Sequence, residues 1–214
     1  GVTLQHVKIS DAADVVKRVR TEKQAGRGAT EGTVDLMWIN GENFAAMKRE
    51  GLLFGPWAET LPHFKLVDVA GKPTTLNDFS VPTEGMESPW GMAQFTLFAD
   101  GKRLPQLPQN MQALLALARA QPGRITHPRL PDFHGTTFIK QALVEFAPDR
   151  QALAKPVTDA AFAAQTAPLW PFLDALRPHL WRGGKQFTLN AAAVRQMMAD
   201  GELLLALTFN PNEA

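Results

Sequence analysis

An apolar run that ends in a polar turn places the strongest constraint on how this chain can fold. Residues 33–39 (TVDLMWI) are nearly all apolar, which is typical of a short strand buried on both faces. The next four residues, NGEN, form turns readily, and apolar residues at helical spacing follow them. This pattern predicts a strand, a polar turn and a helix of about ten residues that begins near Glu42. Ligands of open α/β sheets collect at such turns. The residues that would line this crevice are Trp38, Asn40, Gly41 and Glu42.

A similar pattern precedes this run. Alternating apolar residues predict a strand over residues 2–9, and apolar residues at positions i, i+3, i+4 and i+7 predict a helix over residues 12–19. Residues 1–53 therefore predict the order β-α-β-α, which is half of a doubly wound sheet. A capped strand-to-helix turn with one core tryptophan and no ligand explains the spacing around Trp38 equally well.

Composition limits the classes of protein that fit. The 214 residues suggest one large or two small domains, and 45% hydrophobic with 20% charged residues is typical of a globular protein. A net charge of +1 without a basic block argues against nucleic-acid binding. No apolar run approaches the roughly 20 residues that span a bilayer, so no membrane insertion is expected. The chain opens on Gly1 and not on methionine, so we expect a processed or trimmed product.

Most catalytic and metal-binding signatures are absent from the sequence. The chain has no cysteine, which excludes thiol catalysis, disulfides and thiolate metal sites. It also has no dinucleotide-binding glycine pattern, no phosphate-binding loop and no Gly-x-Ser-x-Gly nucleophile turn. The five histidines do not show metal-ligand spacing. We therefore expect no metal and no cofactor.

The remaining chain predicts a loop-rich stretch and then a second lobe. Prolines break any periodicity over residues 54–90, and Met92 to Phe98 predicts a strand with a domain boundary just after it. Helices are predicted to follow Asn110, over residues 138–146, over residues 169–180 and after a capping Thr188. A last buried strand is predicted over residues 203–209.

Two kinds of ligand fit the polar turns. Gly135, Thr136 and Thr137 at a predicted helix start offer N–H groups and hydroxyls that could bind an anion, although simple helix capping also explains them. Acidic residues near the turns could instead combine with tryptophans in a cage for an organic cation, although most such carboxylates are merely solvated. The sequence leaves the ligand's charge open. The cage residues would be Glu42, Glu84, Glu87, Asp132, Trp38, Trp90 and Trp170.

Several segments carry a resemblance to a known family. GTVDLMWINGENFAAMKREGLL resembles the segment of type II solute-binding proteins in which a strand ends in Asp-x-x-Trp-x-Asn-Gly before a helix. PWGMAQFTLFAD and LPQNMQALLALARAQPGRITHP resemble the crossing strand and the first helix of the second lobe. TAPLWPFLDALRPHLWRGGKQF and ADGELLLALTFNPNEA are similar to the YnjB-type branch of these ABC-importer receptors, which is related to iron-, thiamine- and polyamine-binding receptors. Together these segments cover nearly the whole chain.

The resemblance implies an α/β, two-lobe periplasmic-binding-protein type II fold. It implies lobe one over residues 1–98, lobe two over 99–206 and a return crossing over 207–214, in a partial chain that lacks the first strand and the C-terminal part. The family clamps one ligand between its lobes, with no catalytic residues. Matched by motif, the implied ligand-binding residues are Trp38, Asn40, Gly41, Glu42, Trp90, Gly91, Gly135, Thr136, Thr137 and Asn210.

The function implied is that of a periplasmic receptor of an ABC importer. Its partners would be a small ligand, either an organic cation such as thiamine or a polyamine or a small anion, and the permease subunits; we expect a monomer. Two alternatives share the scaffold: a transferase or hydrolase, and the effector-binding domain of a regulator. Turnover of a candidate ligand would favour the enzyme, and a DNA-binding module upstream would favour the regulator.

Overall fold

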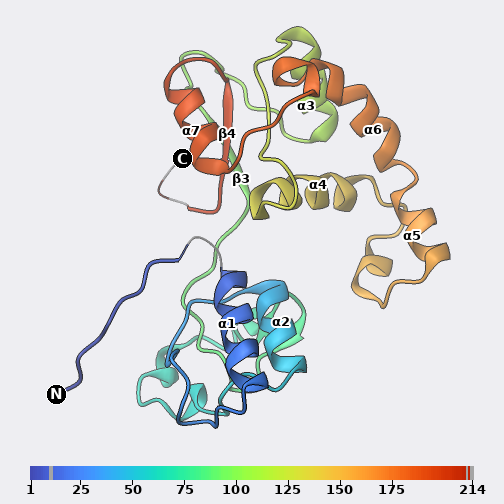
Figure 1. Cartoon of the computed structure of the whole chain (residues 1–214). Coiled ribbons are helices and arrows are strands. Elements are labelled where there is room, and N and C mark those ends of the chain that lie inside the picture. Colours follow the sequence, from blue (N-terminus) through green and yellow to red (C-terminus); the bar gives the residue numbers. More distant parts are fainter. Residues whose placement is uncertain (10–11, 211, 213–214) are drawn as a thin grey trace. The chain divides into compact units, whose positions relative to one another are not determined.

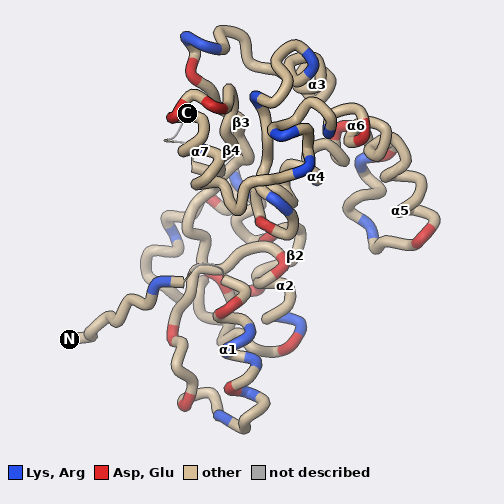
Figure 2. The backbone as a smooth tube through the Cα atoms, turned by 45° about the horizontal axis from the view of Figure 1, so that its top comes forward, with Lys and Arg blue, Asp and Glu red and all other residues tan. Residues whose placement is uncertain are grey.

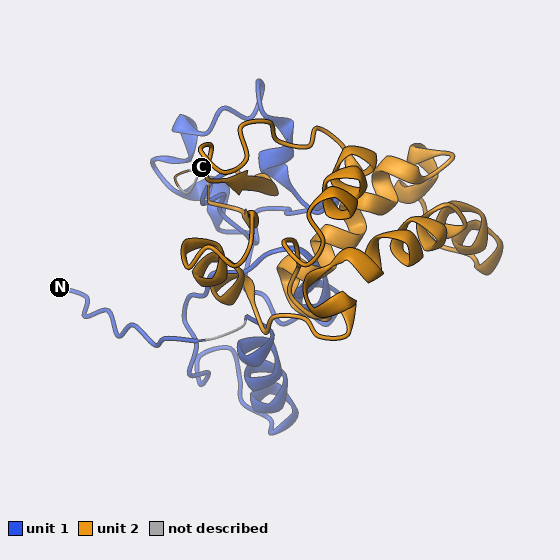
Figure 3. Cartoon of the chain, turned by 90° about the horizontal axis from the view of Figure 1, so that it is seen from above, with its two compact units in different colours: residues 1–91 blue, residues 92–214 orange. Residues whose placement is uncertain are grey.

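The chain divides into two compact units, residues 1–91 and residues 92–214 (Figure 3). The computed structural model describes residues 1–9, 12–210 and 212. The predicted lobe ranges of 1–98, 99–206 and 207–214 differ from this division. The difference arises because β3 (Thr96–Ala99) and β4 (Leu205–Thr208) pair with each other and so belong to one unit. Of the predicted return crossing, residues 211, 213 and 214 lie outside the described part.

Two helices that lie side by side form the main regular structure of unit 1, residues 1–91 (Figure 1). The Arg20 guanidinium on the first helix donates two hydrogen bonds, of 2.7 and 2.8 Å, to the Glu50 carboxylate after the second. Lys23 Nζ donates to the carbonyl oxygens of Glu50 and Gly51 at 2.8 and 3.0 Å, so a cation meets the carbonyl end of that helix. The elements are α1 (Ala12–Gln24), α2 (Gly41–Arg49), the 3₁₀ turns Ala58–Thr60, Phe64–Leu66 and Pro73–Leu76, and the antiparallel pair β1 (Asn77–Asp78) and β2 (Val81–Pro82).

The helices of unit 1 confirm the sequence prediction, but its two predicted strands are wrong. Helix α2 begins at Gly41, one residue before the predicted start. Residues 2–9 and 33–39 have no regular secondary structure, and Leu36 and Trp38 are 75% and 59% exposed. A strand requires a hydrogen-bonded neighbour, and no described backbone group pairs with either segment.

Unit 2, residues 92–214, is mostly helical around one short antiparallel sheet (Figure 1). All four β4 residues are buried, as predicted for the last strand, and Leu207 lies opposite Leu97 in the register. The strand predicted over residues 92–98 is shorter and later, since only Thr96–Ala99 finds a partner. The helices are α3 (Met111–Ala120), α4 (Phe133–Phe146), α5 (Asp159–Thr166), α6 (Leu169–Leu176) and α7 (Ala191–Ala199), with 3₁₀ turns at Arg150–Ala154, Arg177–His179 and Trp181–Gly184.

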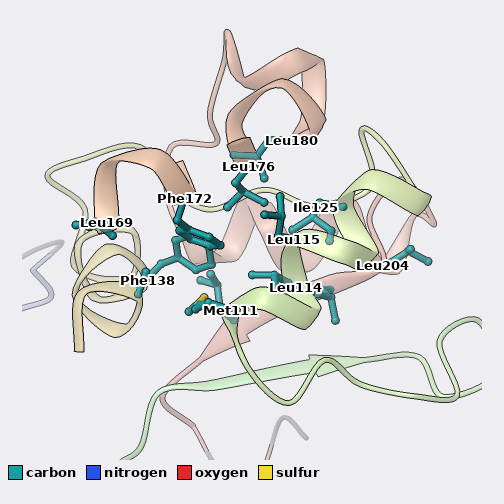
Figure 4. Packing of buried hydrophobic residues seen from close by; sticks show 14 of the residues in the cluster. Met111, Leu114, Leu115, Ile125, Phe138, Leu169, Phe172, Leu176, Leu180 and Leu204 are labelled. Atoms are coloured by element: carbon teal, nitrogen blue, oxygen red, sulfur yellow. The ribbon is translucent and has the colours of Figure 1, made fainter. Parts of the chain in front are cut away.

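Helices α3, α4 and α6 enclose the hydrophobic core of unit 2 (Figure 4). Leu114 on α3, Phe138 on α4 and Leu176 on α6 are each only 1% exposed. They occupy one face of their helices, as the sequence periodicity predicts. A smaller cluster of Val194, Leu203 and Ala206 lies between α7 and β4. Both core clusters lie entirely in unit 2.

Asparagine side chains cap the N-termini of two of these helices. Asn110 Oδ1 accepts from the Ala113 amide at 2.8 Å at the start of α3, which confirms the predicted cap. The start predicted for α7 is wrong: Asn190 caps it by accepting from the Ala193 amide at 3.0 Å, and Thr188 lies two residues earlier. The buried Thr188 hydroxyl has no hydrogen-bond partner among the described residues.

Candidate functional site

The N-terminus of α2 in unit 1 holds three of the predicted ligand-binding residues. Asn40 is the last non-helical residue, with φ −159° and ψ 162°, and its side chain makes no capping bond. Gly41 is buried, and its amide donates to Asp78 Oδ2 at 2.6 Å. Glu42 follows as an exposed acid in the first turn. A carboxylate from β1 therefore occupies the amide end of α2, where helix dipole and N–H groups stabilise negative charge.

A tight hairpin presents that carboxylate. Phe79 and Ser80 form the two-residue connection between β1 and β2, with φ of 46° and 70°. Such left-handed conformations cost about 1–3 kcal/mol each for residues other than glycine, and they concentrate at functional sites. Gly41 also has a positive φ, 55°, and a Cβ there would lie 3.4 Å from the Phe79 ring. The glycine therefore admits both the turn and the aromatic ring, which is 58% exposed.

A second carboxyl adds unusual electrostatics to this region. Burial, and then the charge of Asp78, raise the pKa of Glu87 to about 7. Burial also raises the pKa of Asp78, while the bond from the Gly41 amide opposes that rise. Asp78 therefore ionises first, and Glu87 titrates against an existing negative charge. The α2 N-terminal site, defined as Asn40, Gly41, Glu42, Asp78, Phe79 and Glu87, changes its charge near neutral pH.

The titration of Glu87 predicts a pH-dependent stability of unit 1. Its pKa rises from 4.5 in the unfolded chain to about 7 in the folded chain, so the native state holds the proton more tightly. The free energy of unfolding should therefore fall as the pH rises from 4.5 to 7. Because the carboxyl is partly exposed, we expect a loss of about 1 kcal/mol after allowance for solvent screening. Glu87→Gln should remove this loss, measured by urea unfolding at several pH values.

The control for this experiment is Glu59→Gln, which alters an exposed glutamate of the same unit. Hydrogen bonds and ion pairs lower the pKa values of Glu22 and Glu50, so these groups produce a slope of opposite sign. That slope is present in every variant, and the difference between variants isolates Glu87. Equal pH profiles for Glu87→Gln and the parent chain would contradict the assignment.

The start of α4 in unit 2 contains the predicted anion-binding residues, and each donor has an acceptor within the chain. Asp132 Oδ1 accepts from the amides of His134 and Gly135 at 2.9 and 3.2 Å. The Thr136 hydroxyl donates to the Pro131 carbonyl at 3.3 Å, and the Thr137 hydroxyl to the Phe133 carbonyl at 2.8 Å. Helix α4 begins at Phe133, five residues before the predicted helix over residues 138–146. An aspartate cap explains the early start.

Gly135 is required there for close packing. A Cβ at this position would lie 2.2 Å from the carbonyl oxygen of Pro128. The residue is buried and lies in the first turn of α4. The structure therefore gives Gly135 a role in packing against the preceding chain, independent of any ligand.

The last predicted residue, Asn210, follows β4 near this helix start. Its amide donates to Thr208 Oγ1 at 2.9 Å, and its Oδ1 accepts from the Asn212 amide at 3.0 Å. The preceding Phe209 ring lies 5.0 Å from Phe133 and 5.2 Å from His134, measured between ring centroids. Unit 2 therefore brings the end of β4 to the start of α4.

The tryptophans differ in how far they are free to contact a ligand. Trp38 and Trp90 are 59% and 90% exposed, and Trp90 and Gly91 lie in a segment without regular structure. Trp170 is 50% exposed, but its indole N–H donates to Thr166 Oγ1 at 3.2 Å within unit 2. The sequence pattern does not mark Asp78 or Phe79, because residues 54–90 carry no periodicity from which a hairpin could be inferred.

The described residues contain neither a metal-binding cluster nor a membrane-spanning helix. No three acidic or histidine side chains gather in the described part of the chain as a metal site would require, and none of its helices is long and apolar enough to cross a membrane. Charges of both signs are spread along the tube in Figure 2. A mostly apolar hollow of about 290 Å³ in unit 1 is lined by Leu61, Pro62, His63, Phe64, Val67, Ser88 and Pro89.

Comparison with known proteins identifies one strong similarity. Protein YnjB of Escherichia coli (strain K12) is 51% identical over all 214 residues. These residues span 54% of YnjB, so the chain covers about half the length of the curated relative it matches. No protein-family model matches the chain, and no solved structure gives a significant match. The identity supports the YnjB-type resemblance that the sequence motifs indicate.

Proposed function

We propose that this chain is part of a periplasmic solute-binding receptor of an ABC importer, with the two-lobe type II fold. It binds a small solute and delivers it to the permease without chemical change. The observation that carries the proposal is the similarity to YnjB over the whole chain, because the sequence motifs relate that branch to importer receptors. The division into two compact units is consistent with a two-lobe receptor.

The described residues favour an organic cation over an anion as the solute. Asp78 and Glu87 are two electrostatically coupled carboxyl groups of the α2 N-terminal site. Glu42 adds an exposed acid in the first turn of α2, and Trp38 precedes the helix with an exposed ring. Exposed aromatic faces and carboxylates are the groups that recognise organic cations. The competing anion site at the start of α4 has its amides and hydroxyls engaged within the chain.

A thermal-shift panel of thiamine, spermidine and sulfate tests this proposal. A solute that binds only the native state adds about 2.7 kcal/mol of stability at a concentration one hundred times its Kd. We expect a raised midpoint with thiamine or spermidine. A shift with sulfate alone would move the site to Gly135, Thr136 and Thr137. No shift with any solute of these classes would contradict the receptor function.

The exposed tryptophans supply a separate prediction. Trp38→Ala and Trp90→Ala should each weaken binding of the cation identified in that panel by more than about 1 kcal/mol, because a stacked ring contributes at least that much. Isothermal titration calorimetry measures the change. Trp170→Ala is the matched control, since its indole already bonds to Thr166, and it should leave Kd unchanged. Unchanged affinity in a folded Trp38→Ala, Trp90→Ala double variant would exclude these rings from the site.

A further inference from the structure

Residues 34–39 of unit 1 are held at both ends but unpaired between them. At one end, the amide of Thr33 donates to Glu22 Oε2 on α1 at 3.0 Å. At the other, the Gly41 amide donates to Asp78 on β1 at 2.6 Å. Within the described part of the chain, no hydrogen bond involves residues 34–39. Six consecutive residues therefore present free N–H and C=O groups between two fixed points, as an edge strand does.

Side chains over residues 36–39 of this segment alternate between exposed and half-buried, as in a strand. Met37 and Ile39 are half-buried within unit 1, while Leu36 and Trp38 are 75% and 59% exposed. Both sides of the segment are thus apolar, which is the pattern of a strand covered on both faces. The side that carries Met37 and Ile39 is partly covered within unit 1, and the side that carries Leu36 and Trp38 is exposed.

Residues 2–9 also expose apolar side chains and lack hydrogen bonds. Val2 and Leu4 are 99% and 83% exposed, and Val7 and Ile9 are 58% and 48% exposed. No hydrogen bond of the described residues involves residues 1–9. Each of the two segments precedes one of two helices that pack together, α1 and α2. Each of these two helices is therefore preceded by an apolar segment that joins no sheet of the described residues.

The similarity to YnjB indicates where a pairing partner for residues 34–39 comes from. The chain spans 54% of YnjB, so a polypeptide of that length carries nearly as much chain again outside the 214 residues. Unpaired apolar edges of this kind favour aggregation, and folded proteins pair or cover them. Neither of the two hydrophobic core clusters found among the described residues lies in unit 1.

We propose that residues 2–9 and 33–39 are strands of a sheet completed by the rest of a YnjB-length polypeptide. The partner is an extended segment whose backbone pairs with residues 34–39, accompanied by apolar side chains that cover Leu36. This pairing is independent of any bound solute. Ligand binding and sheet completion therefore succeed or fail separately.

Hydrogen exchange tests the pairing in a chimera in which these 214 residues replace the corresponding part of YnjB. The amides of residues 34–39 should exchange at least about tenfold more slowly in the chimera than in the 214-residue chain. Equal exchange rates in the two proteins would overturn the proposal. Slow exchange in the 214-residue chain alone, together with a dimer in sedimentation, would also overturn it and assign the edge to a second copy.

A matched pair of substitutions tests the cover over Leu36. Leu36→Lys and Leu66→Lys change the same residue type at the same exposure of 75%. In the 214-residue chain, both variants should keep the parent melting temperature. In the chimera, Leu36→Lys should lower it well below the value for Leu66→Lys, because a lysine would replace a covered leucine. Equal melting temperatures for the two chimeric variants would show that Leu36 remains uncovered.

Discussion

Replacing Phe138 by alanine is expected to lower the free energy of unfolding of unit 2 by about 3–5 kcal/mol. The ring is 1% exposed in the core among α3, α4 and α6. It also stacks on His127, with ring centroids 4.8 Å apart and an interplanar angle of 19°. Truncation loses the transfer free energy of the ring and leaves a cavity between helices that can relax only partly. Urea unfolding followed by circular dichroism measures the loss.

Phe162→Ala is the control for this prediction. Phe162 lies on α5 with 54% of its surface exposed, so its removal should change the stability by no more than about 0.5 kcal/mol. A second readout follows from His127, whose pKa is lowered by burial. Loss of the Phe138 ring should admit water beside the imidazole and raise that pKa toward its ordinary value, which NMR titration detects. Equal stability losses for Phe138→Ala and Phe162→Ala would contradict the core described for unit 2.

Gly135→Ala is expected to cost about 3 kcal/mol, the upper end of the usual range for overpacking. The added methyl group would meet the Pro128 carbonyl oxygen at 2.2 Å and its carbon at 2.9 Å. Both are backbone atoms, so relief requires a movement of α4 or of the chain before it. The free energy of unfolding from urea titration measures the cost.

Gly101→Ala provides the comparison, because no atom lies within 4 Å of its added Cβ and its φ is not positive. This variant should retain the parent stability. The pair also distinguishes packing from ligand binding at Gly135. Full stability of Gly135→Ala combined with weakened solute binding would show that the glycine serves a ligand and would contradict the packing role.

Local sequence patterns predicted a helix or strand correctly where the residues of that element define it. Helix α3 followed from its apolar face and from Asn110, whose side chain makes the expected capping bond. Strand β4 followed from a continuous apolar run, and all of it is buried. In contrast, residues 33–39 have an equally apolar pattern and form no strand. A strand depends on a partner far away in the sequence, which a local pattern does not contain.

The candidate site was only partly predictable for a similar reason. Asn40, Gly41 and Glu42 lie in a strand-to-helix turn that the sequence marks clearly. Asp78 reaches the same region through a hairpin in a stretch without periodicity, whereas Glu87 was already among the acidic residues expected in a cation cage. Their proximity, and the raised pKa of Glu87, depend on tertiary contacts and on burial. At the start of α4, Asp132 was expected in a cation cage, but it caps the helix by accepting from the amides of His134 and Gly135.

Equilibrium dialysis of the protein against thiamine, spermidine and sulfate, followed by NMR of the recovered solute, tests the receptor function most directly. We expect that one of these solutes, and foremost an organic cation, binds in a ratio of about one per chain and is recovered chemically unchanged. Conversion of the bound solute into a product would instead identify an enzyme. Absence of binding by all three solutes would contradict the proposed receptor.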